Sequence, residues 1–229
     1  MTVYVSTCDK YMHLLKGFAF LFNKYWGPDQ KVVVLGFSTP PFELPSNFTF
    51  HSMEPVETKA WTDNMRDYFS NIEDDYLVFL FDDYWLTEKI DLEAVKEMEL
   101  LVEAGAVKGD LSNNTNCFPH HNTQGDEGYV IAHTNAMYRT STQPCVWKRE
   151  WLIGILKPGL DPWQFELQGP STELNSGDII GKAGDIFTFA NAYYKGNPAE
   201  YMIDRLTKKD KKALIEISAF VDFDGYTPF

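Results

Sequence analysis

Six consecutive apolar residues, Tyr76–Phe81, lead directly into two adjacent carboxylates, Asp82 and Asp83, and this run constrains the fold most. A short continuous apolar run is typical of a strand that is buried on both faces, as in a parallel sheet. Ligands of open α/β sheets bind beyond the carboxyl ends of such strands. The run therefore predicts a buried strand that delivers two carboxylates to the ligand-binding edge of a sheet.

The first half of the chain alternates predicted strands with predicted helices. Strands are expected at residues 2–6, 31–36, 48–51 and 76–81, and helices at residues 13–26, 59–70 and 92–103. Asp91 is expected to cap the last of these helices, and Gly105 to end it. This alternation indicates an α/β fold with a largely parallel sheet and right-handed crossovers.

The second half is less regular. Residues 112–128 are polar and loop-like. Strands are expected at residues 129–134, 138–139 and 186–194, and helices at residues 144–156, 198–206 and 208–217. Asp161 followed by Pro162 is a further helix start, with Asp at the cap and Pro at the first position. The length of 229 residues fits one large α/β domain or two small ones.

The net charge of the chain makes some classes of binding partner less expected than others. A formal net charge of −13 repels phosphate backbones and anionic membranes, so nucleic acid is not an expected partner. Aromatic residues make up 15% of the chain; most are expected in the core, and a minority could stack on sugars. They also leave room for a homodimer surface.

The three cysteines, Cys8, Cys117 and Cys145, form no CxxC pair, which argues against a disulfide framework and against a zinc site. No apolar stretch approaches the roughly 20 residues that a membrane span needs. No signal peptide is recognised before the first strand. These features together favour a cytoplasmic protein.

Asp82 and Asp83 have a clear chemical use at the end of a strand. One carboxylate could bind a hard divalent cation through oxygen, while the other reaches a ribose or a metal-bound water. A metal held there would bridge a diphosphate and stabilise a leaving group. The alternative is an acidic pair that caps a turn, because such pairs are common in loops.

Residues 75–86 resemble the metal-binding segment of GT-A glycosyltransferases, in which Asp-x-Asp or a variant often ends the central strand. Phe81 stands where the first acid of that motif is often found. The resemblance implies Asp83 as the principal metal ligand, and Asp82 as a second ligand or as the contact to ribose. It implies Mn²⁺ or Mg²⁺ as cofactor and a nucleotide-sugar, with a UDP-sugar expected, as donor.

Other segments carry the same resemblance. Residues 3–9 resemble the first strand and nucleotide loop of that fold, which implies nucleotide contacts for Thr7 and Asp9. Residues 141–149 with 162–166 resemble the acceptor half of small bacterial and phage surface-polysaccharide glycosyltransferases, and residues 192–196 resemble their C-terminal segment.

The resemblance covers most of residues 2–197. It implies a single GT-A-like (Rossmann-like) domain over residues 1–229, built as three α/β/α layers around a central, mostly parallel mixed sheet. Residues 1–110 would bind the nucleotide-sugar and residues 111–229 the acceptor.

Glu166 is predicted as the catalytic base. Inverting sugar transfer needs a carboxylate that takes the proton of the acceptor hydroxyl, and Glu166 lies in a helix start rich in aromatics. Trp163 and Phe165 are predicted to form part of an acceptor platform; core rings and a solvated Glu166 are the alternative. Asp161 and Asp178 are alternative bases, and a retaining enzyme would need none.

Few basic residues are candidates for diphosphate contacts. Lys195 could bind phosphate and Arg66 could reach the nucleotide, with ordinary surface charge as the alternative for both. His120 and His121 lack the spacing of a zinc site and could belong to a loop that closes over the donor.

Sugar transfer from a nucleotide-sugar to a glycan or other hydroxyl acceptor is therefore the expected function. A nucleotidyltransferase acting on sugar phosphates is one alternative, although residues 6–11 offer Lys10 without the glycines of a triphosphate loop. A non-catalytic carbohydrate-binding protein is another. Marks of ATPases, serine hydrolases and dinucleotide oxidoreductases are absent from the sequence.

Overall fold

The computed structural model describes residues 1–53, 59–113, 120–122, 128–168, 176–194, 197–199 and 204–219, and these form an α/β fold, as predicted. The chain divides into two compact units. Unit 1 comprises Met1–Thr2, Met53–Leu80 and Asp91–Ile186, and unit 2 comprises Val3–Ser52, Phe81–Ile90 and Phe187–Phe229. Both units contain residues from before and after residue 110. The nucleotide-sugar role predicted for residues 1–110 and the acceptor role predicted for residues 111–229 stay predictions.

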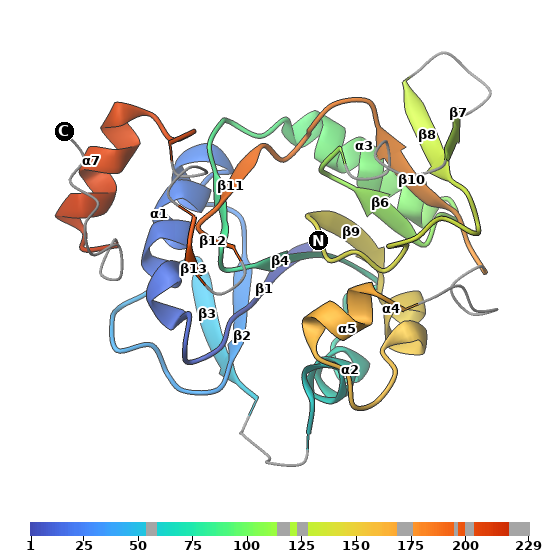
Figure 1. Cartoon of the computed structure of the whole chain (residues 1–229), viewed down its shortest axis with the longest axis horizontal. Helices are drawn as coiled ribbons and strands as arrows, with labels where there is room; N and C mark the ends of the chain where they lie inside the picture. The colour runs from blue at the N-terminus through green and yellow to red at the C-terminus, as the bar shows by residue number, and fades with distance from the viewer. Residues whose placement is uncertain are drawn as a thin grey trace. The chain divides into compact units, whose positions relative to one another are not determined.

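Unit 2 is built on three parallel strands, β1 (Thr2–Ser6), β2 (Val32–Gly36) and β3 (Phe48–Ser52), with β2 in the middle. All residues of β1 and β2 are buried, which explains their continuous apolar sequence. The short helix η1 (Met12–Leu14) leads into α1 (Leu15–Tyr25) (Figure 1). Phe18 and Phe22 of α1 pack edge-on against Phe48 of β3, so α1 covers one face of these strands.

A second, antiparallel ladder of unit 2 joins β5 (Tyr84–Leu86) to β11 (Phe189–Asn191). Trp85 of β5 is fully buried against Gly17 of α1, where an added Cβ would lie 2.3 Å from the indole ring. The close approach of helix and strand therefore requires glycine at this position. The strands β12 (Tyr193–Tyr194) and β13 (Asn197–Pro198) pair next along the chain, and α7 (Lys208–Glu216) packs beside α1.

Unit 1 contains a mixed sheet in the order β4-β9-β6-β10-β8-β7. Its strands are β4 (Tyr76–Phe81), β9 (Cys145–Lys148), β6 (Lys108–Asp110), β10 (Ile179–Lys182), β8 (Tyr129–Ala132) and β7 (His120–Asn122). β6 and β10 run parallel, and the other neighbours in this sheet are antiparallel.

Helices cover both faces of this sheet (Figure 1). Gly109 of β6 faces Met98 of α3 (Leu92–Glu103), while Trp147 of β9 stacks on Trp151 of α4 (Arg149–Ile155) on the other face. α2 (Trp61–Ser70) and α5 (Pro162–Glu166) lie beside each other, and α2 also contacts α4. Unit 1 therefore shows the predicted α/β/α layering.

Local signals placed several elements correctly. The strand Tyr76–Phe81 is found with its predicted bounds. The Asp91 carboxylate accepts hydrogen bonds from the backbone N–H groups of Glu93 and Ala94, as expected for the cap of α3. Asp161 caps α5 in the same way through Gln164 N. Among the described residues, no helix is long and apolar enough to cross a membrane.

The helix predicted for residues 144–156 is wrong in its first part. Cys145–Lys148 is the strand β9, which pairs with β4 on one side and β6 on the other, and only Arg149–Ile155 is helical. A short apolar run does not distinguish a buried strand from a buried helix, so partners elsewhere in the chain decided its state.

Two further element predictions are wrong. Residues 138–139 form a turn in which Tyr138 has a φ of 57°. The guanidinium of Arg139 donates to the carbonyls of Ala132, His133 and Gly177. These hydrogen bonds stabilise the turn, and residues 138–139 pair with no strand of the described sheet. The helix predicted for residues 198–206 is also wrong in its described part, because Asn197–Pro198 is a strand and residues 204–206 form a turn.

Candidate functional site

The end of β1 and the acidic pair after β4 meet in unit 2. Thr7 Oγ1 donates a hydrogen bond of 2.5 Å to Asp82 Oδ2, and Asp82 N donates to Ser6 O at 3.3 Å. Asp82 is only 5% exposed. The structure thus brings together two residues, Thr7 and Asp82, that are 75 positions apart and that the sequence assigned to one nucleotide site.

Burial raises the pKa of the Asp82 carboxyl well above its usual range, and the charge of Asp83 raises it further. The hydrogen bond from Thr7 acts in the opposite direction, because it favours the ionised form. A cation beside this carboxyl would also favour ionisation. Asp82 is therefore a carboxyl whose charge depends on what lies next to it.

Asp83 is half-buried and is positioned through its backbone. Its carbonyl accepts hydrogen bonds from Ala192 N at 2.8 Å and from Trp85 N at 3.1 Å. Ala192 directly follows β11, and Trp85 belongs to β5, so the antiparallel ladder of these strands sets the place of the acidic pair. The sequence did not predict this ladder.

The two carboxylates fit a hard divalent cation better than a soft one. Within the described ranges, no three His, Cys, Asp or Glu side chains gather into a metal-binding group. Mg²⁺ is commonly bound by one or two carboxylates, with waters and substrate phosphates as the remaining ligands. Asp83 and Asp82 match that donor set in number and chemistry. The side chains of His120 and His121 lie outside the described residues.

Asp9 and Tyr11 lie in the loop after β1, and Tyr193 is the first residue of β12. The exposed Asp9 carboxylate accepts from Ser38 N at 3.0 Å and from Ser38 Oγ at 2.8 Å, which ties the loop after β1 to the loop after β2. The rings of Tyr11 and Tyr193 meet edge-on with centroids 5.2 Å apart. Neither tyrosine was predicted as a site residue, although Tyr193 lies in the segment that carried the resemblance. Lys195 lies outside the described residues.

Glu166 belongs to unit 1. Its Oε1 accepts hydrogen bonds from Thr142 N at 2.6 Å and from Thr142 Oγ1 at 2.5 Å. Thr140 Oγ1 donates to the carbonyl of Phe165 at 2.8 Å. The end of α5 is therefore hydrogen-bonded to residues 140–142, and Glu166 is half-buried there.

The predicted acceptor platform divides into one exposed ring and one core ring. Trp163 is 68% exposed, as a surface platform requires. Phe165 is 0% exposed and packs against Trp61 of α2 with ring centroids 5.6 Å apart. The acceptor contact predicted for Phe165 is wrong, because its side chain is part of the core. Asp161, an alternative base, serves as the cap of α5.

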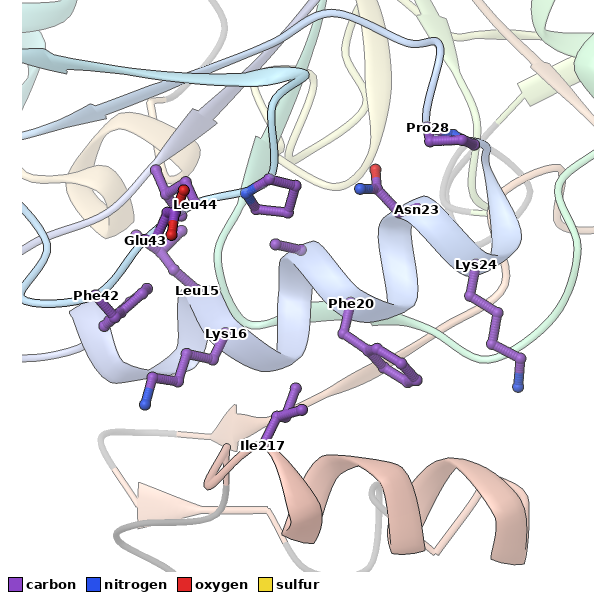
Figure 2. A pocket seen from close by; sticks show the side chains of 12 residues that line it. Leu15, Lys16, Phe20, Asn23, Lys24, Pro28, Phe42, Glu43, Leu44 and Ile217 are labelled. Atoms are coloured by element: carbon purple, nitrogen blue, oxygen red, sulfur yellow. The ribbon is translucent and has the colours of Figure 1, made fainter.

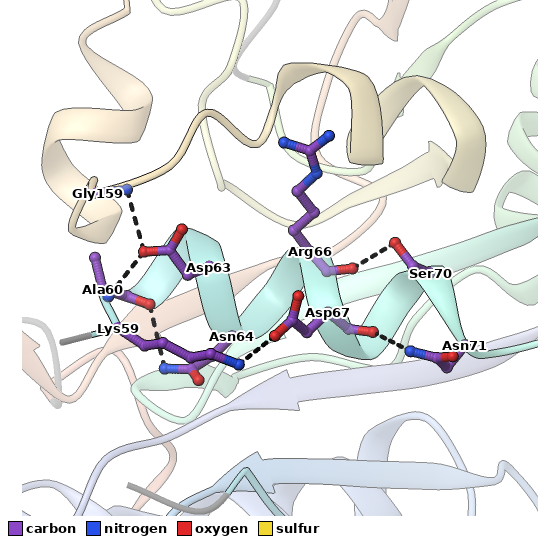
Figure 3. A network of polar contacts seen from close by, with 9 residues as sticks. All are labelled: Lys59, Ala60, Asp63, Asn64, Arg66, Asp67, Ser70, Asn71 and Gly159. Carbon is purple, nitrogen blue, oxygen red and sulfur yellow. Dashed lines mark hydrogen bonds and ion pairs between the residues drawn. The ribbon is translucent and has the colours of Figure 1, made fainter. Parts of the chain in front are cut away.

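Arg66 is an exposed residue of α2, in unit 1. Its carbonyl accepts from Ser70 Oγ at 2.7 Å, and its guanidinium points away from the polar contacts around Asp63 and Asp67 (Figure 3). The predicted residues thus fall into two groups: Thr7, Asp9, Asp82 and Asp83 in unit 2, and Arg66, Trp163 and Glu166 in unit 1.

A pocket of about 610 Å³ opens along α1 in unit 2 (Figure 2). It is lined mainly by apolar side chains of α1 and of residues 42–45, with Ile217 opposite them. None of the predicted site residues is among its described lining. The chemistry of Asp82 and Asp83 is therefore not located in this pocket.

Comparison with known proteins supports the fold assignment. No protein-family model matches the sequence, and no curated protein matches it. The structure is similar to that of UDP-glucose pyrophosphorylase complexed with UDP-glucose, with a TM-score of 0.50 and 8% identity over 94% of this chain and 98% of that chain. This likeness shows the fold alone, and it confirms the predicted GT-A-like (Rossmann-like) α/β class.

Two further solved structures are more distant. The bifunctional IspDF from Campylobacter jejuni gives a TM-score of 0.46 and 12% identity over 90% of this chain. GlyE, a glycosyltransferase of Streptococcus pneumoniae TIGR4, gives 0.41 and 9% identity over 65% of this chain. This chain spans only 54% of IspDF and 34% of GlyE, and neither likeness carries a functional conclusion.

Proposed function

We propose that this protein is a metal-dependent glycosyltransferase that moves a sugar from a nucleotide-sugar, a UDP-sugar by preference, to a hydroxyl group of a glycan or similar acceptor. The observation that carries the proposal is the pair of carboxylates that follows β4. One of them, Asp82, accepts a hydrogen bond from Thr7, the residue that follows β1. The fold is similar to that of a protein whose solved structure contains UDP-glucose.

On the donor side, Asp83 and Asp82 would hold Mn²⁺ or Mg²⁺. When bound, the ion supplies charge neutralisation of the diphosphate leaving group. Thr7 orients the Asp82 carboxylate by donating a hydrogen bond to its Oδ2. Asp9, Arg66 and Lys195 remain proposed contacts of the nucleotide and its phosphates.

On the acceptor side, Glu166 would take the proton of the attacking hydroxyl, which is the role that inverting transfer requires. Thr142 holds the Glu166 carboxylate through Oε1. Trp163 offers an exposed indole face, which suits the C–H-rich face of a sugar ring.

A nucleotidyltransferase acting on sugar phosphates is the second candidate. The observation that favours it is the similarity to UDP-glucose pyrophosphorylase over 98% of that chain. Lys10, an exposed residue of the loop after β1 with its Nζ 4.9 Å from the centre of the Tyr11 ring, would be the cation that contacts phosphate groups in this activity. Pyrophosphate release from a nucleoside triphosphate and a sugar phosphate would identify this activity.

Ligand-induced stabilisation tests the proposed site. UDP with Mn²⁺ is expected to raise the melting temperature of the wild type, because a ligand that binds only the folded state stabilises it by about 2.7 kcal/mol at 100 times its Kd. Asp83→Asn should abolish the shift. Asp29→Asn, which removes an exposed acid elsewhere in unit 2, should retain it.

The outcomes separate the candidates. No shift with UDP and Mn²⁺, together with a shift for another nucleotide, would show that the donor class is wrong. An unchanged shift in Asp83→Asn would remove the acidic pair from the site. Glycan binding without nucleotide binding would favour a non-catalytic carbohydrate-binding protein. Release of UDP from a UDP-sugar in the presence of acceptor then measures the transfer itself.

A further inference from the structure

A buried ion pair lies in the sheet of unit 1, among residues that the proposed function does not use. Lys108 Nζ is 2.9 Å from Asp110 Oδ1, and the two side chains are 0% and 1% exposed. Side chains two positions apart on a strand share a face. Because Gly109 between them faces Met98 of α3, Lys108 and Asp110 point to the opposite face of the sheet.

Lys108 has further partners besides Asp110. Its Nζ donates to Ser141 O at 2.8 Å and lies 5.0 Å from the centre of the Trp147 ring. Burial lowers the pKa of the Lys108 ammonium, but the charge of Asp110, with smaller contributions from Cys145, from the hydrogen bond to Asp110 and from Glu166, outweighs burial and raises this pKa, so the side chain stays protonated.

A buried ion pair adds little net stability. The cost of removing two charges from water is about as large as their attraction, and apolar pairs of similar volume are often as stable. Lys108 and Asp110 therefore call for an explanation other than core stability. One such explanation is that the ammonium fixes the geometry of a neighbouring segment.

That segment is the run Thr140, Ser141 and Thr142, which is at most 4% exposed. Lys108 holds its middle carbonyl, that of Ser141. Thr142, the next residue, donates twice to Glu166 Oε1, and Thr140 donates to the carbonyl of Phe165. The three residues therefore connect the buried lysine of β6 to the end of α5.

We propose that Lys108 is a positioning residue for Glu166. It fixes the Ser141 carbonyl, so that the amide and hydroxyl of Thr142 hold the Glu166 carboxylate in one orientation for proton transfer. The inference rests on the proposed function only for the role of Glu166 as a base. The connection from Lys108 through Ser141 and Thr142 to Glu166 is testable without any substrate.

The test needs a variant that loses the lysine and still folds. Lys108→Met alone leaves Asp110 buried without its counterion, which destabilises the core. The double variant Lys108→Met with Asp110→Leu removes both charges at similar volume. Lys211→Met is the matched control, because Lys211 of α7 is also buried, at 7% exposure, and pairs with Asp204 at 2.6 Å in unit 2.

Amide hydrogen exchange at Thr142 is the first measurement, because this N–H donates to Glu166 Oε1. In the double variant the Thr142 amide is expected to exchange at least about tenfold faster than in the wild type, since its local opening becomes easier. The control should leave the rate unchanged. A wild-type exchange rate at Thr142 in a folded double variant would overturn the proposal.

Steady-state kinetics are the second measurement. The double variant should show a kcat about 10- to 100-fold lower, with the KM for the nucleotide-sugar unchanged, because only the orientation of the base is lost. A merely structural role would not produce this separation of kcat from KM. Faster exchange at Thr142 with a wild-type kcat would therefore also overturn the proposal.

The two failures can be told apart. If the wild type transfers no sugar from any nucleotide-sugar, the proposed function fails. The exchange rate at Thr142 then still decides whether Lys108 holds the segment that binds Glu166.

Discussion

Asp82 is a carboxyl that folding moves out of water, and its protonation should therefore be linked to stability. Its pKa is raised in the folded state, first by burial and then by Asp83. The folded protein thus binds this proton more tightly than the unfolded chain does. Between the unfolded pKa, about 3.9, and the higher folded pKa, the contribution of Asp82 to stability falls as the pH rises.

Asp82→Asn should consequently stabilise the protein at pH 8 in the absence of metal. The amide removes the buried charge and can still accept the hydrogen bond from Thr7. Near pH 4 the gain over the wild type should shrink, because Asp82 of the folded protein is then protonated and carries no buried charge. Thermal unfolding in EDTA at the two pH values measures the difference, with Asp29→Asn as the control. A variant that is less stable than the wild type at pH 8 would contradict this reasoning.

Thr7 supplies the hydroxyl that bonds to Asp82. Thr7→Val keeps the shape and removes the donor, so the free energy of unfolding should fall by about 1–3 kcal/mol, the usual cost of an unsatisfied buried polar group. Thr7→Ser retains the hydroxyl and should lose less. Urea unfolding near pH 7 compares the three proteins, and equal stability of Thr7→Val and Thr7→Ser would show that the hydrogen bond contributes nothing.

At the scale of elements, two helical glycines have opposite expected effects. Gly17→Ala in α1 should destabilise the protein by about 1–3 kcal/mol, because the new methyl group would lie 2.3 Å from the fully buried Trp85 ring. Gly154→Ala in α4 has no atom within 4 Å of the added Cβ, so the higher helix propensity of alanine should stabilise by about 0.5–1 kcal/mol.

Chemical unfolding measures both changes against the same wild type. Comparing the two variants separates the effect of helix propensity from the effect of packing, since the same Gly→Ala change is made at two helical sites. Equal effects of the two substitutions would mean that Trp85 moves aside at little cost.

Elements with strong local signals were predictable. The capped helix Leu92–Glu103 and the strand Tyr76–Phe81 were found with their predicted bounds because a cap residue and a long apolar run are local in sequence. Strand β9 was not, because Cys145–Lys148 becomes a strand only by pairing with β4 and β6. The short strands β5 and β10 were missed for the same reason, since three or four residues carry little periodicity.

At the scale of the whole molecule, each compact unit is assembled from separate stretches of chain. A fragment of residues 1–110 would lack β9, which pairs with both β4 and β6, and β11, which pairs with β5. We expect this fragment to show no cooperative unfolding transition in urea, followed by circular dichroism. Addition of residues 111–229 by co-expression should restore the transition. Cooperative unfolding of the fragment alone would show that the first half is independently stable.

The sequence by itself determined the α/β class and the position of two carboxylates after a buried strand. It did so because apolar runs, caps and turn residues act over a few neighbouring positions. Only the tertiary structure decided which side chains those carboxylates and the proposed base contact. Thr7 beside Asp82, Thr142 beside Glu166 and the buried core position of Phe165 all depend on contacts between residues far apart in the chain. Such contacts leave no periodic signal, because the partner of a side chain is set by folding and not by its sequence neighbours.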